Sequence, residues 1–155
     1  MSTWILLRGL TRETRHWGNF PAQLQAALPT AAIHALDLPG NGSLHRMTSP
    51  WRIEATAAWC RAEAARHGLP PPYHLLAMSL GAMVAVAWAA AAPDAVAAAV
   101  LINTSLRPYS PFHQRLRPAS YATLLHLALP QGDRAHEAAV LKLTSRRAGA
   151  DDELL

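Results

Sequence analysis

The chain has 155 residues, which is enough for one domain with a sizeable hydrophobic core. Half of the residues are hydrophobic and only 15% are charged, so a disordered chain is excluded. The positive charge comes from scattered arginines that form no stripe interleaved with aromatic residues, so no nucleic-acid binding is expected.

The single cysteine, Cys60, excludes an internal disulfide framework and fits a reducing compartment. The N-terminus leads directly into an apolar run without a basic segment or a cleavage site, so no signal peptide is predicted. We therefore expect a cytoplasmic protein.

The first third of the chain alternates apolar runs with a helical pattern. Residues 4–7 are a continuous apolar run that predicts a buried strand, and residues 32–36 are predicted to form the second strand. Between them, large apolar residues recur at helical spacing over residues 17–28, with Pro21 in the first turn. A turn-rich loop over residues 37–42 follows the second strand.

A second helix is predicted from its N-terminal capping residues, its apolar stripe and the glycine that follows it. Ser49 and Pro50 form an N-cap and first-turn pair, and Gly68 suits the C-terminal cap. The inward stripe consists of Ile53, Ala57, Cys60 and Ala64. Cys60 on this stripe is expected to be a small core residue and not a reactive thiol.

The central stretch, residues 73–92, contains a strand, a serine and a helix in immediate succession. The apolar run over residues 73–78 predicts a buried strand, and the alanine-rich segment after Ser79 predicts a helix that ends before Pro93. A serine at such a sharp corner presents its hydroxyl to solvent, provided that the residues two positions away are small. Here they are Ala77 and Gly81.

Two other interpretations of this stretch were weighed. Eighteen uncharged residues, 75–92, reach the length of a membrane span, but half of them are alanine and Ser79 and Gly81 interrupt them, so no membrane span is expected. A buried strand and helix with an incidental serine is the other alternative, since five-residue motifs recur by chance.

A fourth strand is predicted over residues 97–103. Apolar strands that alternate with helices predict an α/β protein with three layers, α/β/α, around a parallel sheet of about four strands. We assign residues 1–105 to this core. Residues 106–155 are expected to form lid-like helices, with apolar residues Tyr109, Phe112, Tyr121, Leu124 and Leu125.

Three loops resemble those of the α/β-hydrolase family. Arg8-Gly9-Leu10 is placed like the family's His-Gly dipeptide, and residues 37–43 look like its Asp-x-Pro-Gly-x-Gly-x-Ser loop. Ala77-Met78-Ser79-Leu80-Gly81 resembles the nucleophile elbow Gly-x-Ser-x-Gly, with Ala77 in place of the first glycine. A dinucleotide-binding fold is disfavoured because no Gly-x-Gly-x-x-Gly follows any strand.

The resemblance implies a serine hydrolase acting on a small-molecule acyl substrate, without a cofactor or a metal. Ser79 would be the catalytic nucleophile, and the backbone amides of Leu80 and Leu10 would form the oxyanion hole. Gly9, Ala77 and Gly81 would set the geometry of the loop and the elbow.

The family takes its triad in the order Ser, Asp or Glu, His. None of the acids or histidines after Ser79 directly follows a predicted strand. We therefore expect a truncated chain that ends before the last two strands and is inactive alone, unless His16 or His113 supplies the base. The alternative is a non-catalytic domain of the same fold that binds a small ligand or a protein partner. The sequence does not fix the oligomeric state.

Overall fold

The computed structural model describes residues 2–106 and Tyr109. Residues Met1–Leu106 form one compact unit. The lid-like helices expected over residues 106–155 lie almost wholly outside the described residues. The lid expectation stays a prediction.

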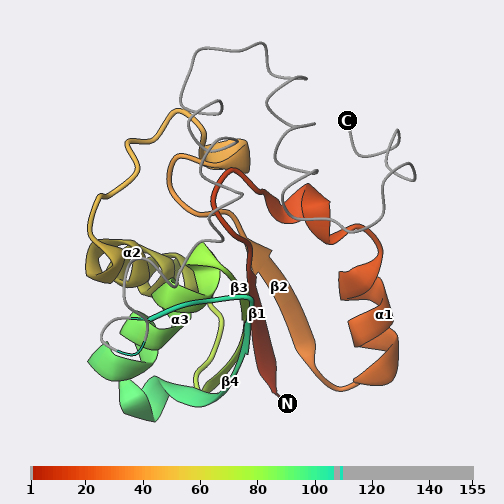
Figure 1. The fold of residues 1–155 in the computed structure, drawn as a ribbon. Coiled ribbons are helices and arrows are strands. Elements are labelled where there is room, and N and C mark those ends of the chain that lie inside the picture. Colours follow the sequence, from red (N-terminus) through yellow and green to blue (C-terminus); the bar gives the residue numbers. More distant parts are fainter. Residues whose placement is uncertain (1, 107–108, 110–155) are drawn as a thin grey trace. The chain divides into compact units, whose positions relative to one another are not determined.

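The described core is a parallel sheet of four strands, as expected, and the strand order is β2-β1-β3-β4 (Figure 1). The strands are β1 (Thr3–Leu7), β2 (Ala32–Leu36), β3 (Tyr73–Met78) and β4 (Val96–Ile102). Leu7 lies opposite Leu36 on one side and Ala77 on the other, and Met78 lies opposite Ile102. The carboxyl ends of all four strands therefore meet at one edge of the sheet.

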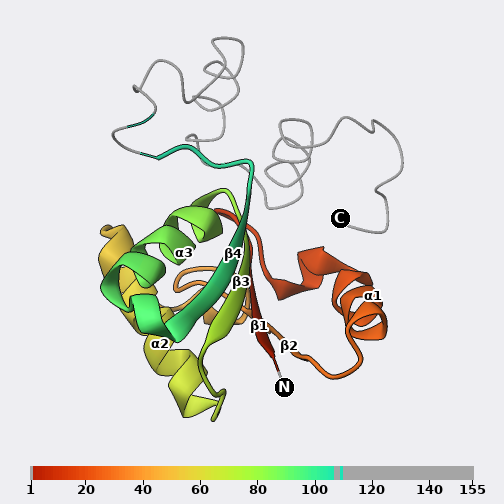
Figure 2. The same ribbon diagram turned by 90° about the horizontal axis from the view of Figure 1, so that it is seen from below.

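Helices cover both faces of the sheet, which gives the expected three layers (Figure 2). Helix α1 (Phe20–Ala27) lies on one face, and α2 (Ile53–Arg66) and α3 (Leu80–Ala91) lie on the other. Alternate side chains of β1 divide between the layers: Ile5 packs with α2 and α3, whereas Leu6 packs with Trp17. This alternation follows from the two-residue period of a strand.

The helix predicted over residues 17–28 is in fact two pieces. A short 3-10 turn, η1 (Thr14–Trp17), precedes α1, and the chain breaks between them at Gly18, whose φ is 51°. Glycine adopts this conformation without a steric penalty. Trp17 still stacks on Phe20, with 5.5 Å between ring centroids. The apolar spacing therefore predicted this packing, but it did not predict the break at Gly18.

The predicted start of α2 is wrong. The N-cap is Arg52 and the first helical residue is Ile53, three residues later than Ser49 and Pro50 indicated. Ser49 instead lies against Gly40 of the loop after β2: a Cβ added at Gly40 would be 2.8 Å from the Ser49 Cβ. A tertiary contact thus overrides a local capping preference. The other features hold, since Ala57, Cys60 and Ala64 are buried and Gly68 follows the helix with φ 65°.

Candidate active site

Ser79 lies at the corner between β3 and α3, in the conformation expected of a nucleophile elbow. Its φ and ψ are 50° and −114°, which are strained for a residue with a side chain. Its amide donates to the Ile102 carbonyl (2.9 Å), and its carbonyl accepts from the Thr104 hydroxyl (3.1 Å). The backbone is thereby held on both sides while the residue stays exposed.

The elbow depends on the absence of a side chain at Gly81. A Cβ there would lie 2.5 Å from the Arg8 carbonyl oxygen and 2.7 Å from that of Leu7, both of which are rigid backbone atoms. Ala77 is fully buried between Leu7 and Leu101 of the neighbouring strands. The first small position therefore accommodates a methyl group, whereas the second requires glycine.

The loop after β1 passes directly over the serine. A Cβ added at Gly9 would lie 3.2 Å from the Ser79 Cβ and 3.6 Å from its Oγ. The amides proposed for an oxyanion hole flank this contact: Leu10 follows Gly9, and Leu80 is the first residue of α3. Within the part of the chain that the structure describes, neither amide donates a hydrogen bond. The first amides of a helix have no partner in a preceding turn and attract anions.

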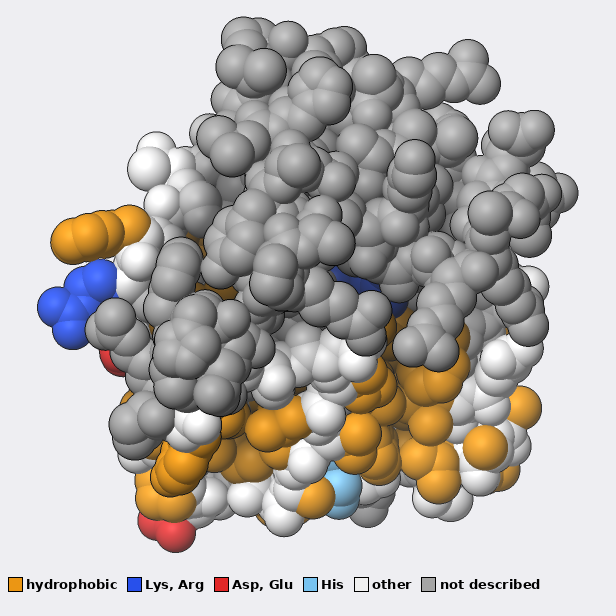
Figure 3. Space-filling model, in the orientation of Figure 1, with side chains coloured by type: hydrophobic (Ala, Val, Ile, Leu, Met, Phe, Trp, Pro, Cys, Tyr) orange, Lys and Arg blue, Asp and Glu red, His pale blue; other side chains and the backbone are white. Residues whose placement is uncertain are grey.

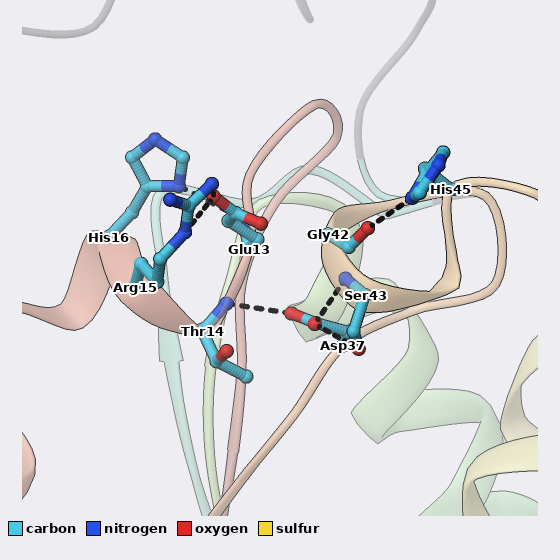
Figure 4. A network of polar contacts seen from close by, with 8 residues as sticks. All are labelled: Glu13, Thr14, Arg15, His16, Asp37, Gly42, Ser43 and His45. Atoms are coloured by element: carbon cyan, nitrogen blue, oxygen red, sulfur yellow. Dashed lines mark hydrogen bonds and ion pairs between the residues drawn. The ribbon is translucent and has the colours of Figure 1, made fainter. Parts of the chain in front are cut away.

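The loops after β1 and β2 are joined by two buried polar side chains. The Asp37 carboxylate accepts from the Thr14 amide (2.7 Å) and from the Ser43 amide (2.9 Å) and hydroxyl (2.8 Å), as Figure 4 shows. The Asn41 Oδ1 accepts from the Thr11 amide at 2.9 Å. These bonds fix the loop that carries Gly9 and Leu10. The sequence predicted the Asp37 loop but not this role of Asp37. A carboxylate directly after a predicted strand was the feature that could have indicated it.

The arginines of this loop are not the solvated surface that exposed charges usually form. Arg15 is exposed and pairs with Glu13, but Arg12 is only 7% exposed and Arg8 is half-buried. The Arg8 guanidinium lies 4.9 Å from the centre of the Trp17 ring, and its Nη1 is 3.0 Å from the Met78 sulfur. Burial, aided by the charge of Arg12, lowers the pKa of Arg8.

No described residue supplies a base to the serine. Among residues 2–106 and Tyr109, no side chain hydrogen-bonds to the Ser79 hydroxyl. The Nδ1 of His16 accepts from the Glu13 amide at 3.0 Å, so a neutral His16 carries its proton on Nε2 and cannot take another there. His113 and the other downstream histidines, with every downstream acid except the exposed Asp94, lie outside the described residues.

The described residues show neither a metal-ligand cluster nor a membrane-spanning helix. They contain no group of three or more His, Cys, Asp or Glu side chains that could hold a metal ion. None of their helices is long and apolar enough to cross a membrane.

The fold and the elbow define the class of protein. The model of the alpha/beta hydrolase fold family matches residues 5–144, and the chain belongs to this family. No protein with a curated description matches the chain.

Solved structures agree on the fold. They include the RedJ thioesterase of prodiginine biosynthesis in Streptomyces coelicolor, which is 16% identical with a TM-score of 0.67, over 99% of this chain and 54% of RedJ. Cfl2 from Burkholderia cenocepacia is 23% identical with a TM-score of 0.62, over 92% of this chain and 48% of its own. An extracellular α/β-hydrolase from a Paenibacillus species is 14% identical with a TM-score of 0.63, over 82% and 51%. The chain thus spans about half the length of the structures that it matches.

Proposed function

We propose that this chain carries the nucleophile and the oxyanion-binding part of a serine hydrolase that cleaves an ester or a related acyl bond. The observation that carries the proposal is the exposed Ser79 in a strained conformation, with Gly9 so close that a Cβ added there would lie 3.2 Å from the Ser79 Cβ. A buried, incidental serine would need neither the strain nor the close approach of a glycine.

The chemistry follows from these groups. The Ser79 oxygen attacks the acyl carbon, and the carbonyl oxygen becomes an oxyanion that the Leu80 and Leu10 amides hold. The oxyanion then collapses, the bond to the leaving group breaks, and water releases the acyl group from the serine. Each oxyanion donor contributes about 100- to 1,000-fold in rate.

The proposed triad acid and histidine lie outside the described residues. A serine hydroxyl needs an adjacent base at neutral pH, and loss of one triad member costs on the order of a million-fold. We therefore expect the 155-residue chain alone to be inactive on esters.

The alternative is a non-catalytic domain that keeps the fold and binds a small ligand or a partner. The observation in its favour is that, among the described residues, the Ser79 hydroxyl has no hydrogen-bond partner. Fold alone does not decide between the two functions.

The test compares this chain with one that is extended through any reading frame following Leu155. A strand followed by Asp or Glu, and then a strand followed by His, would support the enzyme, and an immediate stop would support the alternative. Where the extension carries such residues, it should hydrolyse a p-nitrophenyl ester, and Ser79→Ala should abolish that activity. Hydrolysis that survives Ser79→Ala would contradict the proposal.

A further inference from the structure

Arg8 lies immediately beside the candidate nucleophile. Its carbonyl oxygen would lie 2.5 Å from a Cβ added at Gly81, and a Cβ added at the next residue, Gly9, would lie 3.2 Å from the Ser79 Cβ. Its Nη1 is 3.0 Å from the sulfur of Met78, the residue before Ser79. The guanidinium therefore flanks the elbow at the carboxyl edge of the sheet.

This guanidinium has no anionic partner in the part of the chain that the structure describes. Its Nε is buried without a hydrogen bond, and Nη1 faces only a weakly accepting thioether. In contrast, Arg15 and Arg66 pair with Glu13 and Glu63. A buried donor without an acceptor costs free energy, and more so when it is charged.

A second donor lies beside it. The guanidinium stacks on the ring of Trp17, a side chain only 8% exposed, whose Nε1 is also buried without a partner among the described residues. The charge of Arg12 acts on Arg8 in the same direction as burial, and both lower the pKa of Arg8. An anion beside the guanidinium would supply it with an acceptor and offset the repulsion.

We infer that Arg8 recognises an anionic group, a carboxylate or a phosphate, that the acyl substrate carries near the bond that Ser79 attacks. That the anion belongs to a substrate rests on the proposed function. The binding of an anion by Arg8 can be measured without any turnover. The planar guanidinium suits both groups because it presents parallel N–H donors to two oxygens. An arginine with only a packing role would need no ligand, so binding distinguishes the two roles.

The experiment titrates the full chain with hexanoate, hexyl phosphate and the neutral hexanamide, while the Arg8 Nε–H resonance is followed by ¹H–¹⁵N correlation spectroscopy. At least one anion should shift this resonance, and hexanamide should not. The anion that binds more tightly, hexanoate or hexyl phosphate, shows whether the site prefers a carboxylate or a phosphate. No shift with either anion would overturn the inference, and this result needs no variant.

Arg8→Gln keeps a polar side chain of similar length and removes the charge. It should weaken anion binding by about 10- to 100-fold, the range that hydrogen bonds to charged groups contribute. Arg61→Gln, on the exposed face of α2, makes the same change of charge and should have no effect. Equal affinity in the Arg8 variant would refute the site. Anion binding at Arg8 in an extended chain whose Ser79 does not hydrolyse the p-nitrophenyl ester would refute the proposed hydrolase and leave the binding site standing.

Discussion

At the scale of single residues, Gly81 is the position where the smallest change should have the largest effect. Gly81→Ala puts a methyl group within 2.7 Å of two backbone carbonyl oxygens that cannot turn away. Such overpacking costs about 1–3 kcal/mol of the free energy of unfolding, measurable by urea denaturation. Ala77→Gly, which restores the family's pattern, should cost only about 1 kcal/mol. Equal stability of Gly81→Ala and the unaltered chain would show that the elbow is looser than described.

Cys60 should be inert in the folded protein. It is fully buried on α2, and burial raises the pKa of its thiol to about 12, so almost no thiolate is present at neutral pH. A thiol reagent should therefore label it only at the rate at which the chain opens. Rapid labelling under native conditions would contradict the burial of this stripe.

The same thiol predicts a dependence of stability on pH. Below pH 9 it is protonated in both states and contributes no slope. Between pH 9 and about 12 the unfolded chain loses this proton and the folded chain keeps it, so the free energy of unfolding falls by about 1.4 kcal/mol per pH unit. The difference between the curves of the unaltered chain and Cys60→Ala isolates this slope. Parallel curves would refute it.

At the scale of elements, the strands were predictable because each is a short and mostly apolar run. Residues 32–36 and 73–78 match β2 and β3, and β1 and β4 differ from prediction by one residue. Helix ends were harder because distant contacts decide them. Ser49 and Gly40, which lie against each other, are 9 residues apart in the sequence, and no local pattern predicts their contact.

The elbow was predictable for the same reason as the strands, since a local motif encodes it. The burial of Arg8 and Arg12 was not, because it depends on Trp17 and on the loop after β2 folding over the same edge. Charged residues in a loop are usually solvated, and only the structure shows this exception.

Strand β4 is the element most exposed to unwanted association. Within the described residues it pairs only with β3, and Val100 and Leu101 are 45% and 38% exposed. Figure 3 shows hydrophobic side chains gathered on the face that carries this region. Uncharged edge strands of this kind template further pairing. We expect the 155-residue chain to aggregate or to bind a hydrophobic dye.

A charge on this edge should reverse the effect. Val100→Lys should lower dye binding and the aggregate fraction in sedimentation, because lysine on an edge opposes strand addition. Ala62→Lys, on the exposed face of α2, is the matched control and should change neither. A monodisperse monomer with a cooperative melt in the unaltered chain would count against an open edge.

At the scale of the whole molecule, the chain covers about half the length of its solved relatives, and the described residues hold the exposed Ser79 without a side chain hydrogen-bonded to its hydroxyl. The proposed hydrolase divides two properties between parts of the protein. We propose that the geometry of attack depends on the elbow and the loop after β1, and that the activation of the hydroxyl depends on groups outside the described residues.

The most direct test is the pH dependence of fluorophosphonate labelling of the 155-residue chain, with the adduct located by mass spectrometry. Without a histidine base, Ser79 should be unlabelled at pH 7, and its slow labelling should rise about tenfold per pH unit up to pH 10, as hydroxide replaces the base. The exposed Ser49, which lies in a loop and not at the start of a helix, should react more slowly at every pH. Labelling of Ser79 that levels off near pH 7, and that His16→Ala or His113→Ala abolishes, would place the base within this chain and contradict the account. Equal labelling of Ser49 and Ser79 would refute the nucleophile itself.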